Sequence, residues 1–232
     1  NIKVLAIDTD PAANLANALG IPAEIRNKII PISRQKALIE ERTGAKVKQY
    51  GQMFKLNPEV SDIADKYAIN YNGVSLLVVG AIEKGGSGCA CPENILVRAL
   101  VTNLVVQRNE ALIMDMEAGL EHLGRATVSG VDALLIVVES GQRSVDCAKM
   151  IMGMANDIKL KKLYIAANKV SSREDEMFIR NSFPDREIMG MIPFSEKVRR
   201  SDMDGKSVLE AIEPETREAF EAILKNLENM VK

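Results

Sequence analysis

Short apolar runs alternate with amphipathic segments along most of the chain. The run Ala133–Val138 is nearly continuous in Leu, Ile and Val, which is typical of a strand buried on both faces. Runs of this kind predict strands at residues 2–7, 74–80, 111–115, 133–138, 162–167 and 187–191. Apolar residues at helical spacing predict helices near residues 15–19 and at residues 93–108, 143–157, 173–182 and 213–231.

This order of elements predicts an α/β protein. Strands that alternate with helices form a mostly parallel twisted sheet with helices on both faces, and ligands bind at the carboxyl ends of the strands. No internal repeat, linker or low-complexity segment interrupts the pattern, so we expect a single domain over residues 1–232.

Residues 21–72 do not follow the alternation. They are polar and mixed, with a helical stretch at residues 33–42 and weak extended signals at residues 53–56. We therefore expect a long irregular excursion that serves as a lid or a partner surface.

Composition excludes several classes of protein. Hydrophobic residues make up 47% of the chain and charged residues 27%, a balance typical of a globular protein. The formal net charge of -2 does not favour a nucleic-acid partner. No apolar run is long enough to span a membrane, and no signal peptide is recognisable. Three cysteines are too few for a disulfide framework, so we expect a reducing, cytoplasmic setting.

Carboxylates follow two of the predicted strands. Asp8 and Asp10 follow the first strand, and Asp115 ends the strand at residues 111–115. Carboxylates at the ends of neighbouring parallel strands suit hydrated Mg²⁺, which prefers oxygen ligands. Gly119, four residues after Asp115, lets a backbone N–H approach a terminal phosphate closely. The alternative is that these aspartates only cap the helices that follow them.

A glycine-rich stretch, Lys84-Gly85-Gly86-Ser87-Gly88-Cys89-Ala90-Cys91, lies between a predicted strand and a predicted helix. It imitates a phosphate-binding loop but has Cys89 and Ala90 where such a loop carries its lysine and its hydroxyl. Gly205-Lys206-Ser207 has the last three residues of a phosphate-binding loop, but Arg200 stands where its first glycine belongs. Neither segment is expected to bind phosphate.

The paired cysteines indicate a metal instead. Cys89 and Cys91 supply two thiolates, whereas a closed zinc site needs four ligands, so a two-fold dimer would complete the site. Thiolates suit Zn²⁺ and also hold Ni²⁺, and the sequence does not choose between them. The alternative is a pair of reduced, partly buried cysteines. Cys147 is expected to be a small core residue, and the single histidine, His122, is expected to be structural.

Several segments resemble one class of proteins, the dimeric deviant P-loop ATPases of the MinD, ParA and nitrogenase iron protein class. Asp8-Thr9-Asp10-Pro11 and Asp115-Met116-Glu117-Ala118-Gly119-Leu120-Glu121 resemble the two switch segments of that class. Asn168-Lys169 resembles its adenine-contacting segment, and Ile192-Pro193-Phe194-Ser195 resembles the loop beside the base. The stretch at residues 84–94 is similar to the cysteine loop of the CooC subfamily, the nickel-insertion ATPases of carbon monoxide dehydrogenase.

The resemblance implies the fold of a MinD-like P-loop NTPase and a role for each motif. In such a protein ATP or ADP binds with Mg²⁺ near Asp115, and Asp8 belongs to the nucleotide site. Asp10 orients the attacking water, and Gly119 senses the γ-phosphate. Asn168, Lys169 and Pro193 border the base.

The same resemblance implies a metallochaperone. The protein would be a homodimer that holds Ni²⁺ or Zn²⁺ at its interface through Cys89 and Cys91. ATP hydrolysis would be coupled to metal binding and to dimerisation, and the client would be carbon monoxide dehydrogenase.

One part of the family pattern is not found. Members of this class begin with a strand, a loop of the form K-G-G-x-G-K-[ST] and a helix before the segment that corresponds to Asp8-Thr9-Asp10-Pro11. We therefore expect a sequence clipped by roughly 30 residues, about one strand–helix unit, which would bind ATP poorly as it stands. Two alternatives stay open: a non-catalytic metal-binding or interaction module, and a positioning ATPase of the ParA or MinD kind.

Overall fold

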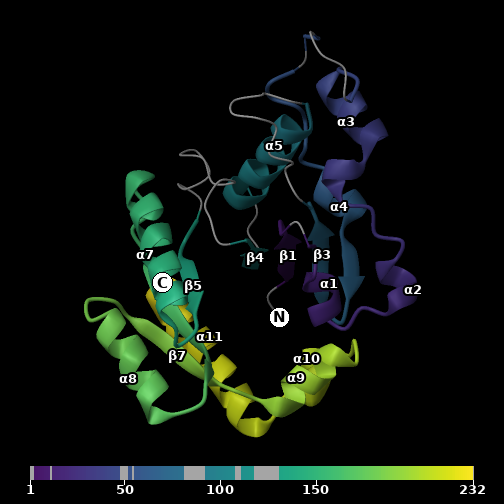
Figure 1. The fold of residues 1–232 in the computed structure, drawn as a ribbon. Coiled ribbons are helices and arrows are strands. Elements are labelled where there is room, and N and C mark those ends of the chain that lie inside the picture. The colour runs from purple at the N-terminus through teal and green to yellow at the C-terminus, as the bar shows by residue number, and fades with distance from the viewer. Residues whose placement is uncertain are drawn as a thin grey trace. The chain divides into compact units, whose positions relative to one another are not determined.

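A computed structural model describes residues 3–10, 12–47, 52–53, 55–80, 92–107, 111–117 and 131–231 (Figure 1). Packing divides the chain into two compact units, Asn1–His122 and Leu123–Lys232, and each is described by itself. The expectation of one domain over residues 1–232 stays a prediction.

The first unit is built on a four-stranded sheet in the order β2-β3-β1-β4. Strand β1 is parallel to both β3 and β4, and β2 is antiparallel to β3. The strands are β1 (Val4–Asp8), β2 (Ile69–Tyr71), β3 (Val74–Val78) and β4 (Ala111–Asp115). The helices are α1 (Leu15–Ala18), α2 (Ala23–Arg26), the 3₁₀ turn η1 (Ile32–Arg34), α3 (Lys36–Thr43), α4 (Ile63–Tyr67) and α5 (Pro92–Gln107).

Both faces of this sheet are covered, because successive side chains of a strand point to opposite sides. Leu5 and Ile7 of β1 pack in the same buried cluster as Leu96 and Leu100 of α5. Ala6, between them, belongs to a second cluster with residues around α1 and α2, which include Ala16 and Ile21. The apolar residues at positions 4–7 of β1 therefore reflect burial on two sides, as the sequence predicted.

Residues 21–72 are more ordered than expected where the structure describes them. Helix α3 overlaps the predicted helical stretch at residues 33–42, but begins and ends later, and none of the described residues near 53–56 is in a strand. Arg42 of α3 donates to the Asp62 carboxylate at 2.8 Å, which ties α3 to the start of α4.

The antiparallel strand β2 was not predicted, although the sequence carries a signal for it. Asn72 and Gly73 join β2 to β3, and both have positive φ angles, 48° and 84°. A two-residue Asn-Gly connection between two strands is the common hairpin turn. The parallel sheet of this unit therefore has one antiparallel edge.

The second unit has a three-stranded parallel sheet in the order β5-β6-β7. The strands are β5 (Leu134–Val138), β6 (Leu163–Val170) and β7 (Ile188–Pro193). The helices are α7 (Gln142–Asp157), α8 (Arg173–Ser182), α9 (Glu196–Met203), α10 (Val208–Ala211) and α11 (Pro214–Val231). Helix α8 has the predicted bounds, but α9 and α10 were not predicted.

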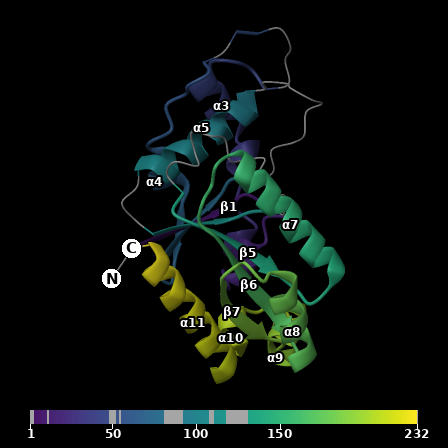
Figure 2. The ribbon, with the colours of Figure 1, turned by 90° about the vertical axis from the view of Figure 1, so that its left-hand side faces the viewer.

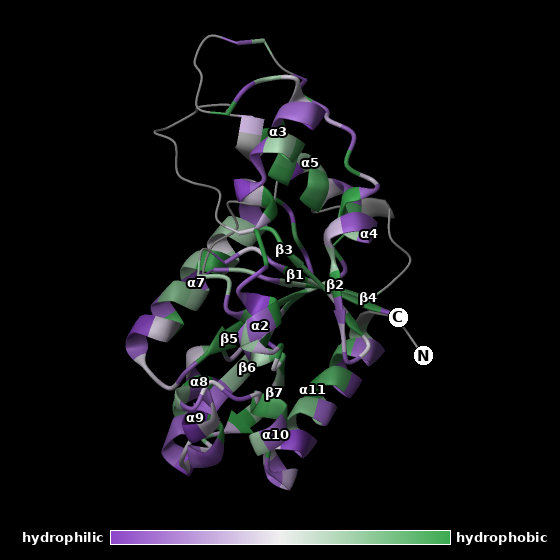
Figure 3. Cartoon of the chain, turned by 90° about the vertical axis from the view of Figure 1, so that its right-hand side faces the viewer, coloured by the Kyte–Doolittle hydropathy of each residue, from purple (hydrophilic) through white to green (hydrophobic). Residues whose placement is uncertain are grey.

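Helices cover both faces of this second sheet too. Helix α11 lies on one side, while α7 and α8 lie on the other (Figure 2). Figure 3 shows the alternation of hydrophobic and hydrophilic residues along α11. Ile223 of α11 is buried against Tyr164 and Met189 of the sheet. The predicted apolar face of α11 is only partly buried, because Phe220 is 44% and Leu224 58% exposed.

The end strand β5 does not match the prediction of burial on both faces, and the other end strand, β4, is also partly exposed. Ile113 of β4 is 60% exposed and Val137 of β5 is 57% exposed. Each of these strands lies at the end of its own sheet, so one of its edges has no neighbouring strand among the described residues.

Candidate nucleotide site

Asp8 and Asp115 lie directly opposite each other in the parallel pairing of β1 with β4. The side chain of Asp8 is fully buried, and both of its oxygens accept backbone N–H groups. Oδ1 accepts from Asp10 at 3.1 Å and Oδ2 accepts from Leu15 at 3.0 Å. Asp8 therefore braces the segment that follows β1, rather than presenting a free carboxylate.

Asp10 lies in that braced segment and is half-buried. Its Oδ1 accepts from the N–H of Ala12 at 2.6 Å, and its carbonyl accepts from the N–H of Ala13 at 3.0 Å. Ala13 has a φ of 49°, a left-handed conformation that is uncommon for a residue with a Cβ. The backbone here makes a tight turn that fixes the position of the Asp10 carboxylate.

Thr9 joins the two aspartate segments and was missed by sequence reasoning. Both its backbone N–H and its hydroxyl donate to the Asp115 carbonyl, at 3.0 and 2.8 Å. Thr9 is 1% exposed, so its side chain fills the space between the ends of β1 and β4. The sequence does carry one signal for its role, because Thr9 is a small residue with a hydroxyl group between Asp8 and Asp10.

Burial raises the pKa of the Asp8 carboxyl above its ordinary value, and the backbone N–H groups of Leu15 and Asp10 oppose this shift. The charge of Asp115 raises it further. Asp115 has an exposed side chain, yet desolvation beside the strand ends, with a smaller effect of the Asp10 charge, also raises its pKa. The site thus concentrates negative charge that lacks a compensating cation among the described side chains around it.

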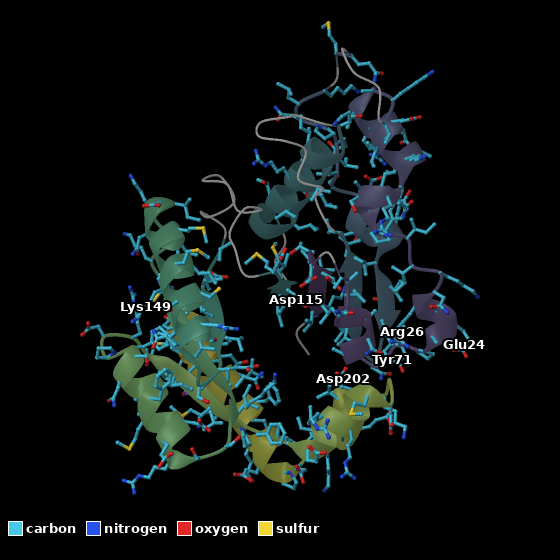
Figure 4. The ribbon with its side chains drawn as sticks, in the orientation of Figure 1. Glu24, Arg26, Tyr71, Asp115, Lys149 and Asp202 are labelled. Atoms are coloured by element: carbon cyan, nitrogen blue, oxygen red, sulfur yellow. The ribbon has the colours of Figure 1, made fainter. Side chains whose placement is uncertain are left out.

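These residues could bind Mg²⁺, because this ion needs only one or two protein carboxylates. Within the described parts of the chain, no group of three or more His, Cys, Asp or Glu side chains is arranged to hold a metal ion. Mg²⁺ keeps several waters and is bound through one or two carboxylates together with substrate phosphates. Asp115, whose carboxylate is exposed (Figure 4), is the side chain here that offers such a ligand.

The predicted base-contacting residues come together in the second unit. Strand β6 extends to Val170, so Asn168 and Lys169 lie within the strand rather than after it. Pairing with β7 is interrupted between Ala167 and Val170, and Val170 then pairs with Pro193. The interruption places Asn168, Lys169 and Pro193 at the carboxyl ends of neighbouring strands, as a ligand site at this edge requires.

Lys169 is held in an unusual conformation by two contacts. Its φ is 57°, and its backbone N–H donates to Asn168 Oδ1 at 3.0 Å. Its ammonium group lies 2.6 Å from Glu139 Oε1, in the loop after β5. Sequence reasoning missed Glu139, because its link with Lys169 depends on β5 and β6 being neighbours.

A second link starts from the same loop after β5. The Asp175 carboxylate, in the first turn of α8, accepts from the backbone N–H groups of Ser171 and Ser172 at 2.9 and 3.1 Å, and Ser172 Oγ caps α8. A side-chain hydrogen bond with Ser140, which follows Glu139, is the largest cause that lowers the pKa of Asp175. Side-chain contacts therefore join the loop after β5 to the end of β6 and to the start of α8.

Other predicted site residues lie outside the described residues. These are Gly119, Cys89, Cys91 and His122. Cys147 is a free cysteine on α7 and is half-buried rather than fully in the core.

The segment Gly205-Lys206-Ser207, which was not expected to bind phosphate, connects α9 to α10. Gly205 has a φ of 65° just after α9, and Ser207 Oγ caps α10 by accepting from Leu209 at 3.2 Å. Lys206 lies 3.3 Å from Asp204, so its ammonium group already has a carboxylate partner.

Comparison with known proteins defines the class. The profile of the CobQ/CobB/MinD/ParA nucleotide binding domain matches residues 1–208. The chain belongs to this family, and it has the MinD/ParA-like P-loop NTPase fold. The MinD protein of the MinC:MinD cell division complex of Aquifex aeolicus matches with a TM-score of 0.63 and 20% identity, over 99% of this chain and 83% of that one.

Two relatives share a higher sequence identity with this chain. The carbon monoxide dehydrogenase accessory protein CooC of Rhodospirillum rubrum is 41% identical over 97% of this chain and 85% of its own length. An uncharacterized ATP-binding protein of Methanocaldococcus jannaschii is 42% identical over 89% of this chain and 79% of its own length. The resemblance to the CooC subfamily is confirmed.

None of the helices in the described part of the chain is both long enough and apolar enough to cross a membrane.

Proposed function

We propose that this protein is an ATPase that serves nickel insertion into carbon monoxide dehydrogenase in the cytoplasm. The observation that carries the ATPase part is the alignment of Asp8 with Asp115, bridged by Thr9, at the carboxyl ends of β1 and β4. The identity of 41% with CooC of Rhodospirillum rubrum over 97% of the chain supports the client.

The first aspartate segment positions the reaction at the terminal phosphate of ATP. The turn after Asp8 holds the Asp10 carboxylate, which accepts a hydrogen bond from the attacking water and orients it. Gly119 lies four residues after Asp115, and its backbone N–H contacts the γ-phosphate.

Asp115 is the carboxylate that binds Mg²⁺, directly or through a water. When bound, Mg²⁺ neutralises charge that develops on the phosphate oxygens. The hydrogen bonds from Thr9 to the Asp115 carbonyl hold the end of β4 in place while the carboxylate stays accessible.

Asn168, Lys169 and Pro193 recognise the adenine base. The interruption of the β6–β7 pairing takes Asn168 and Lys169 out of the ladder. Asn168 Oδ1 accepts the N–H of Lys169, so the amide Nδ2 of Asn168 is the group that donates to a flat polar ring. The proline fixes the backbone beside the ring.

Nickel is the cargo in this proposal, and zinc is the competing ion. Cys89 and Cys91 from each of two subunits form a four-thiolate site, so metal binding requires a homodimer. ATP hydrolysis changes the association of the subunits and thereby releases the metal to the client enzyme.

The test uses the full-length protein and measures ATP hydrolysis, dimer formation and nickel binding in parallel. We expect Asp10→Ala to abolish hydrolysis while nucleotide binding persists, and Cys89→Ala/Cys91→Ala to abolish nickel binding while hydrolysis persists. Cys147→Ala is the matched control and leaves both unchanged. Nickel binding without any ATP hydrolysis would instead identify a non-catalytic metal module.

A further inference from the structure

A polar groove lies beside the aspartate segment in the first unit. Its volume is about 320 Å³. All of its lining residues belong to the first unit, and they come from α1, α2, the segments that flank them and β3: Ala13, Asn14, Ala16, Asn17, Arg26, Asn27, Ile29, Pro31 and Val78. A space of this size accepts a small organic molecule.

The polar part of the lining carries positive charge only. Arg26, Asn14, Asn17 and Asn27 are among its lining residues, and no carboxylate is. A guanidinium is a donor only, and a side-chain amide can turn its NH₂ group toward an acceptor. A groove with this one charged group therefore favours an anion with several oxygens over a cation.

Arg26 (Figure 4) is held in place but retains donors for a ligand. Its Nη1 donates to Asn17 Oδ1, which fixes the guanidinium between α1 and α2. None of the ion pairs found between described residues includes Arg26, and a guanidinium has further N–H groups in a planar fork. That fork matches the geometry of a phosphate.

Asn14 contributes a second available group. It is the N-cap of α1, yet its side chain makes no capping hydrogen bond. Its neighbours Ala13 and Leu15 belong to the backbone that also holds the aspartates, since Ala13 donates to the Asp10 carbonyl and Leu15 donates to Asp8 Oδ2. One wall of the groove is therefore the reverse side of the turn that fixes Asp10.

We propose that this groove binds the phosphate group of a small phosphorylated molecule, with Arg26 as its anchor and the three asparagine amides as further donors. The site is separate from the proposed nucleotide site, and the proposal does not depend on the ATPase function. Occupation of the groove stiffens residues 12–17 and so stabilises the turn at Asp10.

The experiment is a calorimetric titration of the full-length protein with inorganic phosphate, in the presence of a saturating non-hydrolysable ATP analogue and Mg²⁺, so that the γ-phosphate position of the nucleotide site is filled. We expect Arg26→Gln to weaken phosphate binding by about tenfold or more, because it removes a charge-assisted pair. Lys28→Gln is the matched control, since it removes the same charge from an exposed neighbour that does not line the groove. Arg26→Lys is expected to restore part of the affinity.

Two further measurements complete the test. Asn27→Asp introduces a carboxylate at an exposed C-cap and is expected to abolish phosphate binding even if Arg26→Gln fails to fold. Hydrogen exchange of residues 12–17 is expected to slow when phosphate is added. Absence of phosphate binding, equal loss in the Arg26 and Lys28 variants, or binding that survives Asn27→Asp would each overturn the proposal.

Discussion

The Asp8 carboxylate accepts the backbone N–H of Leu15 at 3.0 Å, although seven positions separate the two residues along the chain. This bond closes the segment after β1 into a loop whose inner side is the buried carboxylate and whose outer side carries Asp10. The geometry of the candidate catalytic turn therefore depends on a side chain that is inaccessible to substrate.

Replacing Asp8 tests this dependence. We expect Asp8→Ala to lower the free energy of unfolding by about 2 kcal/mol, because two backbone N–H groups lose their acceptor in a buried setting. The rate of ATP hydrolysis by the full-length protein is expected to fall by more than the fraction of unfolded protein explains. Urea denaturation and a hydrolysis assay measure the two effects.

The control for this variant is Asp132→Asn, which alters an exposed carboxylate outside the sheet strands. It is expected to change neither stability nor hydrolysis. An Asp8→Ala protein with unchanged stability would show that Asp8 does not brace the turn.

The raised pKa of Asp115 predicts a pH-dependent difference between the wild-type protein and Asp115→Asn. A carboxyl whose pKa is higher in the folded state binds a proton more tightly there, so its contribution to stability falls as pH rises through that pKa. We expect the variant to gain stability relative to wild type as pH rises from the ordinary value of 3.8 toward neutrality.

Urea denaturation at a series of pH values, with EDTA present to remove divalent cations, measures this difference. Because the Asp115 side chain is exposed, solvent screening keeps the effect small. A difference between the two proteins that is independent of pH contradicts the prediction.

Gly190 on β7 marks a close approach between the strand and α11. A Cβ at this position would lie 2.5 Å from Ile223 Cγ1, so we expect Gly190→Ala to destabilise the protein by about 1–3 kcal/mol through overpacking. Gly153→Ala is the matched change on α7, where a Cβ meets nothing within 4 Å. It is expected to stabilise the protein by about 0.5–1 kcal/mol through helix propensity.

Thermal or urea denaturation of the two alanine variants gives the comparison. Combining Gly190→Ala with Ile223→Ala should cost less than the sum of the single changes, since the second change removes the atom that the new Cβ meets. If the losses of stability from the two single changes were strictly additive, the Gly190→Ala effect would not come from contact with Ile223.

The strands of both sheets were largely predictable from the sequence, and their partners were not. The run Ala111–Asp115 became β4 with the predicted bounds, because a short apolar run between polar segments leaves a clear pattern. Helix α8 also has its predicted bounds, and Ser172 with Asp175 forms a capping box at its start. Local hydrogen bonding of this kind is encoded within a few residues.

The site was only partly predictable for a related reason. Asp8, Asp10 and Asp115 could be found because carboxylates at strand ends are a local signal. Thr9 acts through a carbonyl 106 positions away, and such a contact exists only once β1 and β4 are paired. The position of Thr9 between two aspartates marks it as a candidate, but its partner cannot be identified without the sheet.

The contact between Glu139 and Lys169 yields a prediction for nucleotide binding. Both side chains are more than half exposed, so their pairing is worth at most about 1 kcal/mol, or about a fivefold change in affinity. We expect Glu139→Lys to weaken ATP binding by up to that factor and to leave the turnover number unchanged, because Lys169 binds the base and takes no part in hydrolysis in our proposal.

The charge-swapped protein, Glu139→Lys combined with Lys169→Glu, is the companion variant. It restores the ion pair in reverse and is expected to recover the order of the loop after β5 and the end of β6, but not contacts that need the Lys169 ammonium group. ATP affinity measured for the wild type, Glu139→Lys, Lys169→Glu and the double variant separates the two roles. If all of these proteins bound ATP with equal affinity, neither Glu139 nor Lys169 would belong to the base site.

The short hairpin strand β2 has a consequence for how the protein behaves at high concentration. A long flat strand at the edge of a sheet is a template on which other chains add strands and build fibres. Here β2 ends the first sheet with only Ile69–Tyr71, and the Asn72-Gly73 turn bends the chain back at once. That edge is too short to nucleate cross-β growth, so concentrated solutions should not form fibres from this side of the sheet.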